Sequence, residues 1–561
     1  MKKIYNLTFG LLAASSLMLT GCIDETLPTN GVTNEQLAAS PKAAEAMLWG
    51  MPAFTNKLQV LTDQDFDWGY GSMMHIRDCM TGDYAIVESN YDHYTSWENN
   101  EYMGMNYLRT QFFWNYYTKF LLTANNMVGA LEPSKESLMP ISKGYLGAAY
   151  AYRAFIYLDM ARMFEYLPCD VTTGELEEPV TVKNVWKDYG YQTDKDSITI
   201  TDVTNFTVPL VTPYTTEAEA SHNPRAPREV MAKFIESDLQ NAIALLPNLT
   251  TDLKTLPHLD VAYGLMARLY MWIEDYDKAY AYADSAINAG NHTVLTRDEW
   301  LNPASGFNTL ETSSWMLGSQ MTQSDDVVQT GILNWTSWAS NETYYGYAAA
   351  GPMSMIDANM YKRISDTDFR KLSWKAPKGS ALSGQETYID PEYGNSKTLV
   401  AYASLKFRPG QGNMDDYTVG SACAYPLMRV EEMYFIKFEA LAHKNAAQGL
   451  AELTDFMKQY RDPNYKYTGI NETPAIIDEI FFQKSVELWG EGLTFFDVKR
   501  LNKSVTRYYP GTNFPTDAQM NTNGRPAWMS ICIVQTEQNS NSALMGCNNP
   551  DPSDKYSRAG E

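Results

Sequence analysis

Two glutamates near the end of the chain are the clearest candidates for acid–base chemistry. Glu487 and Glu491 are four residues apart, so on a helix they would lie on one face. A glycosidase pair instead flanks a bond across a cleft, with carboxyl groups about 5 to 9.5 Å apart. Two acids one helical turn apart, beside apolar neighbours, are more typical of charges paired between helices. We therefore predict a structural role for both glutamates and no catalytic residue.

Other motifs also argue against an enzyme. The sequence has no G-x-S-x-G, H-E-x-x-H or G-x-x-x-x-G-K segment, and its six histidines lack metal-ligand spacing. Asp63, Asp65 and Asp67 alternate as in a calcium loop, but Trp68 stands at the sixth position, where that loop needs glycine. We expect a polar loop there, with calcium as the alternative. No other metal and no cofactor is predicted.

The N-terminus indicates export and a lipid. A basic start is followed by an apolar and hydroxyl-bearing run over residues 7–20, which ends at Gly21 and Cys22. This pattern, too short to span a membrane, is typical of a signal peptide. The four residues that end at Cys22 resemble the bacterial lipobox, which implies cleavage before Cys22 and diacylation of its sulfur. A plain secretory signal with an incidental cysteine is the alternative.

The residues after Cys22 point to the cell surface. Asp24 and Glu25 resemble the acidic export signal that sends Bacteroidetes lipoproteins to the outside of the cell. Residues 22–40 are small, polar and interrupted by Pro and Gly, as in a flexible tether. More than one acyl chain gives stable membrane attachment. We therefore expect a lipid-anchored outer-membrane protein that faces the cell exterior.

Bulk composition narrows the classes of partner. Hydrophobic residues make up 44% and charged residues 20% of the 561 residues, as in folded globular proteins. The net charge of −23 disfavours nucleic acid and anionic lipid surfaces as partners. After residue 20, no apolar run reaches the about 18 residues of a membrane-spanning helix. Of the other cysteines, only Cys532 and Cys547 are close in sequence, and a disulfide between them is the alternative to two thiols.

Aromatic residues give the sharper prediction of a binding site. The chain has 38 Tyr, 13 Trp and 21 Phe, and Tyr and Trp suit surfaces that are apolar on one side and hydrogen-bonding on the other. A sugar needs such rings beneath it and polar side chains at its edge. Two loop segments supply both, and packing of each ring onto the helices is the alternative. Their candidate ligand-binding rings are Trp68, Tyr70, Tyr91, Tyr94 and Trp97 in the first segment and Trp335, Trp338, Tyr344, Tyr345 and Tyr347 in the second.

Helical periodicity indicates the scaffold that carries these loops. Residues 261–290 and 428–461 each read as a pair of helices, the first with a turn near Glu274–Tyr276, as in tetratricopeptide repeats. Single helices are predicted over 107–131, 141–166, 227–247 and 474–502. Three loop-rich insertions separate these helices, and long irregular stretches in a compact domain usually carry function. The insertions cover about residues 62–106, 291–425 and 504–561, of which the last is expected to be exposed.

The predicted fold class is therefore all-α. Residues 1–21 are expected to be removed as a lipoprotein signal peptide, and residues 22–40 to form the lipidated tether. Residues 41–561 should then form a single domain of irregular helix pairs, because the spacing of these pairs is too uneven for a regular solenoid. The insertions should form one binding face on it.

Five segments carry recognisable motifs in a fixed order. They are 153–168, with Arg153-Ala154-Phe155, Phe164 and Pro168; 225–247, with Arg228-Glu229-Val230 and Leu246-Pro247; 262–271, AYGLMARLYM; 425–440, with Pro426, Arg429 and Glu432; and 487–502, with Glu491-Gly492 and Asp497. Together they resemble the SusD/RagB family of Bacteroidetes nutrient-binding outer-membrane lipoproteins. Gln483, Lys484, Thr494 and Pro227 depart from the family pattern, which questions local ion pairs more than the fold.

This resemblance implies a SusD-like helical scaffold and a function without catalysis. The protein would capture an oligo- or polysaccharide and deliver it to a SusC-like TonB-dependent β-barrel transporter. In the family, ligand-contacting rings come from loops before a W-x-x-Y helix, here Trp114–Tyr117, and before a D-x-R segment, here Asp368–Arg370. Both aromatic segments fall in these windows. Peptide uptake on the same scaffold, a surface glycosidase, and a non-catalytic protein-binding scaffold remain alternatives.

Overall fold

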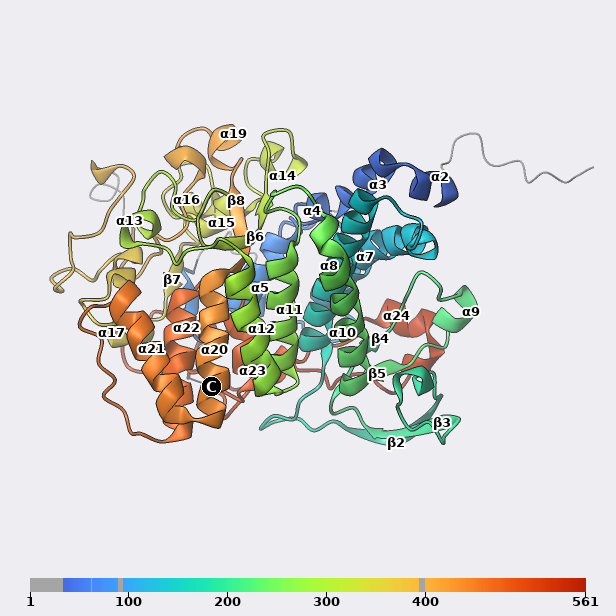
Figure 1. The fold of residues 1–561 in the computed structure, drawn as a ribbon. Helices are drawn as coiled ribbons and strands as arrows, with labels where there is room; N and C mark the ends of the chain where they lie inside the picture. The colour runs from blue at the N-terminus through green and yellow to red at the C-terminus, as the bar shows by residue number, and fades with distance from the viewer. Residues whose placement is uncertain (1–33, 62, 89–93, 393–398, 561) are drawn as a thin grey trace, which may run out of the picture.

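The computed structural model describes residues 34–61, 63–88, 94–392 and 399–560. Long helices stand side by side in these residues and form the scaffold (Figure 1). Along the array α7 packs on α8, α8 on α10, α10 on α11, α11 on α12, α12 on α20 and α20 on α21 and α22. Their bounds are α7 Leu108–Leu131, α8 Pro140–Phe164, α10 Arg228–Leu245, α11 Leu259–Trp272, α12 Tyr276–Ala289, α20 Val430–Lys444, α21 Ala446–Tyr460 and α22 Thr473–Glu487.

Helix α8 packs closely against the end of α10, because Gly144 and Gly147 of α8 lie at the contact. A Cβ at Gly144 would lie 2.5 Å from the backbone nitrogen of Leu249, just beyond α10. A buried ion pair fixes the same contact, since Arg153 donates to both carboxylate oxygens of Asp238 at 2.7 Å. Bidentate pairing of this kind adds geometric specificity. The helices predicted over 107–131, 141–166 and 227–247 are confirmed within a few residues at each end.

The predicted tetratricopeptide-like pair over 261–290 is confirmed as α11 and α12. The chain reverses at Glu274, whose φ is 64°. The Asp275 carboxylate then caps α12 by accepting from the Lys278 N–H at 3.2 Å. Helices α20 and α21 form a second pair, with the Asn445 side chain as the cap of α21. These pairs are the part of the fold that periodicity alone predicts.

The single helix predicted over 474–502 is wrong, because the chain breaks between α22 and α23 (Thr494–Arg500). Gly490 and Gly492 have φ of 75° and 68°, in the left-handed region that favours glycine. A Cβ at Gly492 would lie 2.6 Å from the Cα of Met74. The Gly492 N–H donates to the Asp78 carboxylate at 3.0 Å. The break thus locks the end of the scaffold onto the first insertion.

Glu487 and Glu491 are buried among cations at this break. Arg461 donates to both oxygens of Glu487 at 2.8 Å, and Arg429 donates to both oxygens of Glu491 at 2.9 Å. Lys406 reaches Glu491 at 2.7 Å. Burial alone would raise the pKa of each carboxyl, but these cations hold both pKa values below their usual range. The predicted structural pairing is confirmed, although Glu491 lies beyond the end of its helix.

Short strands supplement the helices, both between α8 and α10 and in the insertions. Within the described residues they form four two-stranded antiparallel sheets, which pair β1 with β7, β2 with β3, β4 with β5 and β6 with β8. In the last sheet Ser319 lies opposite Tyr425, and β8 leads directly into α20. The bounds are β1 Tyr84–Ile86, β2 Glu175–Lys183, β3 Ser197–Asp202, β4 Phe206–Pro209, β5 Arg225–Pro227, β6 Trp315–Gln320, β7 Ser354–Ile356 and β8 Ala424–Arg429.

The remaining helices are short and lie mostly in the insertions. Helices α14, α15, α16 and α19 gather at one end of the molecule, at the top of Figure 1. The bounds are α3 Pro41–Leu48, α4 Gly50–Phe54, α5 Tyr70–Cys79, α6 Thr95–Glu98, α9 Glu217–Ala220, α13 Arg297–Trp300, α14 Asp326–Gln329, α15 Trp335–Ala339, α16 Tyr347–Ala350, α17 Ala358–Arg363, α19 Tyr417–Gly420 and α24 Gln535–Ser540.

The C-terminal segment 504–561 is not the exposed tail that its composition predicts. Trp528 and Ile531 are fully buried, and the Trp528 indole donates to the Met80 carbonyl at 2.8 Å. Arg507 is buried as well and donates to the Cys79 carbonyl at 2.8 Å. The segment closes over α5 and completes the core. Its two cysteines are free thiols rather than a disulfide.

The N-terminal predictions are tested only in part. Residues 1–33, with the signal peptide and Cys22, lie outside the described residues. The prediction of a tether that extends to residue 40 is wrong at its end, because α2 (Asn34–Ala39) is helical. Leu37 and Ala38 pack against the core, and α2 contacts α7. Apolar residues in a polar stretch thus mark where the folded domain begins.

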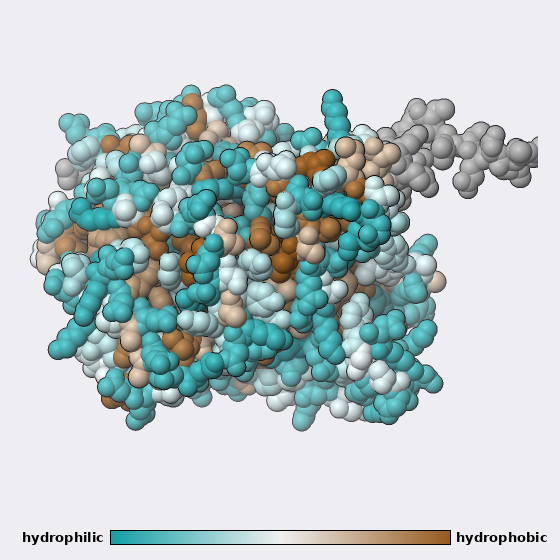
Figure 2. Space-filling view, in the orientation of Figure 1, coloured by the Kyte–Doolittle hydropathy of each residue, from teal (hydrophilic) through white to brown (hydrophobic). Residues whose placement is uncertain are grey.

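The surface is mainly hydrophilic. Figure 2 shows hydrophobic residues in small separate areas on one face, surrounded by hydrophilic residues. Among the described helices, none combines the length and the apolar character needed to cross a bilayer.

Candidate ligand-binding site

The two predicted aromatic segments meet in the structure. The rings of Tyr94 and Trp338 pack edge to face with centroids 4.6 Å apart, and Tyr347 stacks on Trp338 at 4.2 Å. Trp68 and Trp335 lie on either side of Gly71 in α5, where a Cβ would be 2.7 Å and 3.2 Å from their rings. Segments more than 200 residues apart in sequence thus share one aromatic cluster.

Six of the ten predicted rings are buried, which contradicts their prediction as ligand platforms. Their ring faces pack against other side chains inside the protein. Trp335 stacks on Tyr425 at 5.0 Å, and the Tyr70 hydroxyl donates to Asp159 at 2.5 Å. These rings fasten the insertions to the scaffold, as the packing alternative states. Tyr91 lies outside the described residues. The buried six, each at most 3% exposed, are Trp68, Tyr70, Tyr94, Trp97, Trp335 and Trp338.

His75 is buried within this aromatic cluster. Its ring lies 4.4 Å from that of Tyr94 and 5.8 Å from that of Trp338. Burial lowers the pKa of His75 to about 3. The imidazole is therefore neutral at physiological pH, and the cluster behaves as core.

Three predicted tyrosines reach the surface, and a fourth joins them. Tyr344 is 43% exposed, and Tyr345 and Tyr347 are half-buried. Tyr417, which is not among the predicted rings, is 36% exposed, and its ring centroid lies 6.4 Å from that of Tyr345. The neighbouring Ile332 is also exposed. We call Ile332, Tyr344, Tyr345 and Tyr417 the tyrosine patch.

Loop hydrogen bonds position the tyrosine patch. The Tyr344 N–H donates to the Met414 carbonyl at 2.9 Å, which joins the two loops that carry the rings. The Asp416 carboxylate starts α19 by accepting from the Thr418 N–H at 2.9 Å. The ring of Tyr417 then covers Gly331, where a Cβ would lie 3.6 Å from the ring. The patch is thus held at the end of the molecule that carries α14, α15, α16 and α19 (Figure 1).

Polar groups surround these rings. Burial, with the nearby carboxylates of Asp390 and Asp415, raises the pKa of Tyr344 above its usual range. Asp415 is exposed, and the Gln323 amide donates to the Thr418 hydroxyl at 3.1 Å on the same surface. Carboxylates accept hydrogen bonds from hydroxyl groups, while tyrosine rings offer apolar faces. The site can therefore bind a ligand by stacking tyrosine rings on its apolar face and by accepting hydrogen bonds from its edge.

A second exposed aromatic pair lies at the junction of the first insertion and α7. Tyr102 and Tyr107 are 50% and 40% exposed, and their rings pack edge to face at 5.4 Å. The Arg109 guanidinium lies 5.4 Å from the Tyr102 ring. Neither tyrosine is among the rings predicted from the sequence. Both flank the short Met103–Asn106 segment before α7, and no motif in the sequence distinguishes them from the buried rings.

Of the three alternating aspartates, Asp67 is bound within its own loop. The Asp67 carboxylate accepts from the backbone N–H of Leu61, and the Asp67 carbonyl accepts from the Gln59 N–H at 2.9 Å. Burial raises the pKa of Asp67 to about 6. In the described ranges, no group of three or more acidic, histidine or cysteine side chains is arranged to hold a metal ion. The aspartates shape a loop against the core.

Comparison with known families decides the identity of this scaffold. A SusD-like family model, described as starch-binding and associating with outer membrane, matches residues 50–271. The model of the SusD family itself matches residues 283–545. The chain is a SusD/RagB-like protein. The resemblance inferred from the motifs is confirmed.

Solved structures confirm the SusD-like fold. A SusD-like carbohydrate binding protein from Bacteroides vulgatus is 20% identical, with a TM-score of 0.66 over 91% of this chain and 98% of that one. A SusD superfamily protein from Bacteroides thetaiotaomicron is 17% identical, with a TM-score of 0.63 over 91% and 100%. A SusD-like carbohydrate binding protein from Bacteroides fragilis is 15% identical, with a TM-score of 0.61 over 91% and 99%. Curated proteins gave no match.

Proposed function

We propose that this SusD/RagB-like protein binds an oligo- or polysaccharide at the tyrosine patch. The observation that carries the proposal is the exposure of Tyr344 and Tyr417 beside carboxylates, on a scaffold whose family model is described as starch-binding. Two relatives of the same fold are named as carbohydrate binding proteins. A glycan fits this surface better than a protein partner, since the apolar area is small and interrupted by charges.

Binding at this site needs no bond to be broken. The ring faces of Tyr344 and Tyr417 stack on the C–H faces of successive sugar units, and Asp415 accepts hydrogen bonds from hydroxyl groups at their edges. Tyr345 supports the Tyr417 ring from the side. Tyr102 and Tyr107 offer a second stacking surface for a longer chain.

We further propose that the protein delivers its ligand to a SusC-like TonB-dependent transporter. Lipidation at Cys22 would hold it on the outer face of the outer membrane, beside such a barrel. The family description, which associates these proteins with the outer membrane, supports this location. Metabolic labelling with an alkyne fatty acid should mark the wild type and not Cys22→Ser. Purification in mild detergent should recover a β-barrel with the wild-type protein, and recovery of none would contradict the delivery.

Titration calorimetry of the purified full chain tests the ligand class. The panel consists of neutral polysaccharides, their oligosaccharides and mixed peptides. The expected result is saturable binding of a glycan and no detectable binding of the peptides. Binding of peptides alone would replace the proposal with peptide uptake, and binding of neither class would favour a protein-binding scaffold.

A further inference from the structure

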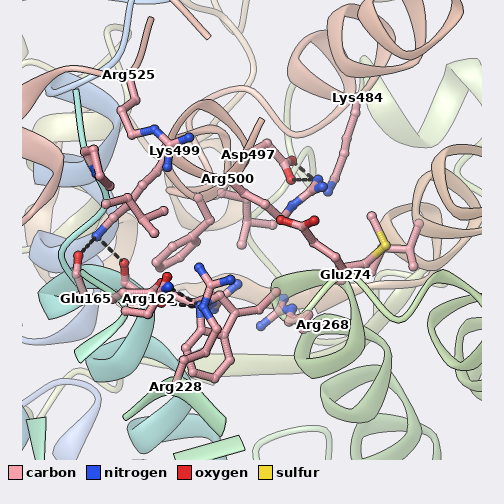
Figure 3. A pocket seen from close by; sticks show the side chains of 18 of the residues that line it. Arg162, Glu165, Arg228, Arg268, Glu274, Lys484, Asp497, Lys499, Arg500 and Arg525 are labelled. Atoms are coloured by element: carbon pink, nitrogen blue, oxygen red, sulfur yellow. Dashed lines mark hydrogen bonds and ion pairs between the residues drawn. The ribbon is translucent and has the colours of Figure 1, made fainter. Parts of the chain in front are cut away.

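A cavity of about 240 Å³ lies in the helical scaffold, and none of its lining residues belongs to the tyrosine patch. It forms where the ends of α8 and α11, the start of α10 and helix α23 meet (Figure 3). Seven Arg and Lys side chains line it, against four carboxylates. Such a density of cations in an enclosed space needs a physical explanation, because burial disfavours charge.

Ion pairs occupy three of the four carboxylates. Glu165, which is buried, pairs with Arg228 and also accepts from the Trp272 indole at 2.9 Å. Arg268 donates to both oxygens of Glu432, at 2.7 Å and 2.6 Å. In the same way Asp497 pairs with Lys484 at 2.7 Å and with Arg500 at 2.9 Å. The fourth carboxylate, Glu274, is exposed at the mouth.

Two of the cations have no carboxylate partner among the described residues. Lys499 is buried and donates to the carbonyls of Arg162, Met163 and Glu165 at 2.7, 3.1 and 2.6 Å, at the C-terminal end of α8. Arg525 donates from Nε to the Asn502 side-chain oxygen at 3.1 Å. Burial lowers the pKa of both, and so does the positive charge of Arg228. Arg162 and Arg500 also pair with carboxylates outside the lining, Asp159 at 2.6 Å and Glu439 at 2.7 Å. Among the described residues, the cations of this cavity without a carboxylate partner are therefore Lys499 and Arg525.

Some guanidinium N–H groups that line the cavity have no acceptor among the described residues. Arg228 donates to Glu165 through Nε alone, and neither terminal nitrogen of Arg525 has an acceptor in the described part of the chain. Figure 3 shows Arg162 and Arg228 entering from one side and Arg525 from the opposite side. Two opposed guanidinium groups with free N–H pairs are arranged to hold the oxygens of one anion.

Apolar side chains form part of the wall, beside the polar Thr204 and Asn205. Trp272, Phe496 and Ile436 line it, and the Arg162 guanidinium lies over the Phe496 ring at 3.6 Å. An apolar wall suits a carbon skeleton, whereas phosphate or sulfate alone would leave it uncovered. The volume is below the about 300 to 1,000 Å³ typical of drug-sized ligands. The occupant that fits is a small organic molecule of about monosaccharide size.

We propose that this cavity is a binding site for a small organic carboxylate, with Arg228 and Arg525 as the ligands of the carboxylate group and Trp272 and Phe496 as the wall against its carbon skeleton. The site is separate from the tyrosine patch, so neither proposal rests on the other. A carboxylate-bearing sugar such as a uronic acid has the required size and chemistry.

Calorimetry of the full chain with three small carboxylates, D-galacturonate, D-glucuronate and benzoate, tests this proposal. D-galactose and inorganic phosphate serve as comparison ligands. At least one carboxylate should bind saturably and at least tenfold more tightly than either comparison ligand. Phosphate binding as tightly as the carboxylates would overturn the organic ligand class, and silence of all three carboxylates would overturn the site.

Two variants with opposite expected effects on carboxylate affinity separate loss of the site from loss of folding. Arg525→Gln removes a charge that has no carboxylate partner among the described residues, and it should weaken carboxylate binding at least tenfold. Glu274→Gln removes the repelling carboxylate at the mouth, and it should tighten binding severalfold, which a misfolded protein cannot do. Arg297→Gln, an exposed arginine on α13, controls for net charge and should leave the affinity unchanged. Equal affinities for Arg525→Gln, Glu274→Gln and wild type would contradict the assignment.

Discussion

Tyr347 stacks on the buried Trp338 with ring centroids 4.2 Å apart. This pair joins the surface of the second aromatic segment to the cluster beneath it, where Trp338 also meets Tyr94 of the first segment. The cluster therefore acts as the structural base of the insertions, whereas the proposed ligand surface consists of exposed tyrosines. The two roles can be separated by mutation.

Trp338→Ala should destabilise the protein strongly. Loss of a buried tryptophan removes its packing and leaves a cavity, at a cost of about 3 to 5 kcal/mol. Urea unfolding followed by circular dichroism measures this loss. The exposed Tyr344→Ala should stay within about 0.5 kcal/mol of wild type. Similar small effects for both variants would show that Trp338 is not core.

His75 should make stability depend on pH. Its folded pKa of about 3 lies below the unfolded value of about 6.5, so the unfolded chain binds more protons between these pH values. The contribution of neutral His75 is fully present above pH 6.5 and is lost as pH falls toward 3, by up to about 1.4 kcal/mol per pH unit. His75→Gln should have a shallower pH slope of unfolding free energy than wild type, and the exposed His222→Gln the same slope as wild type. Parallel slopes for wild type and His75→Gln would refute the assignment.

Glu487→Gln should destabilise the scaffold without any relation to catalysis. The variant leaves Arg461 and its neighbours as buried, undercompensated charges, which costs about 3 to 5 kcal/mol. The thermal midpoint should fall accordingly, while Glu178→Gln, an exposed glutamate on β2, should melt as wild type does. An unchanged midpoint for Glu487→Gln would show that the buried network is dispensable.

Gly492→Ala should disturb the break between α22 and α23. Its positive φ costs an alanine about 1 to 2 kcal/mol, and the added Cβ meets the Met74 backbone at 2.6 Å. Gly511 has φ of 81°, and no neighbouring atom lies within 4 Å of the position that a Cβ would take there, so Gly511→Ala should show the conformational cost alone. Urea unfolding should therefore rank Gly492→Ala as the less stable variant, and the reverse order would refute the close approach.

Sequence patterns predict the helical scaffold well because its signal is local. The turn at Glu274 and the long helices follow from apolar spacing within single segments. The break at Gly490 and Gly492 does not follow from the pattern, because apolar residues continue at helical spacing on both sides and the reason for the break is a distant contact with Met74. Periodicity does not report contacts between remote parts of the chain.

The candidate site was harder to predict for a related reason. Tryptophan and tyrosine suit both a core with internal partners and a wet surface, so Trp335 and Tyr344 look alike in sequence. Only the fold shows that Trp335 has Tyr425 beneath it while Tyr344 is exposed. Tyr417 was missed because it stands alone among polar residues, and its partner Tyr345 lies 72 residues earlier in the chain.

The most direct test of the glycan proposal compares two exposed tyrosines. Tyr417→Ala removes a ring of the tyrosine patch, and Tyr214→Ala removes a ring that is 58% exposed on the loop before α9. Calorimetric affinity for the glycan identified with wild-type protein should fall at least tenfold in Tyr417→Ala, which corresponds to about 1.4 kcal/mol, and stay unchanged in Tyr214→Ala. Equal affinities in both variants and wild type would contradict a binding site at the tyrosine patch.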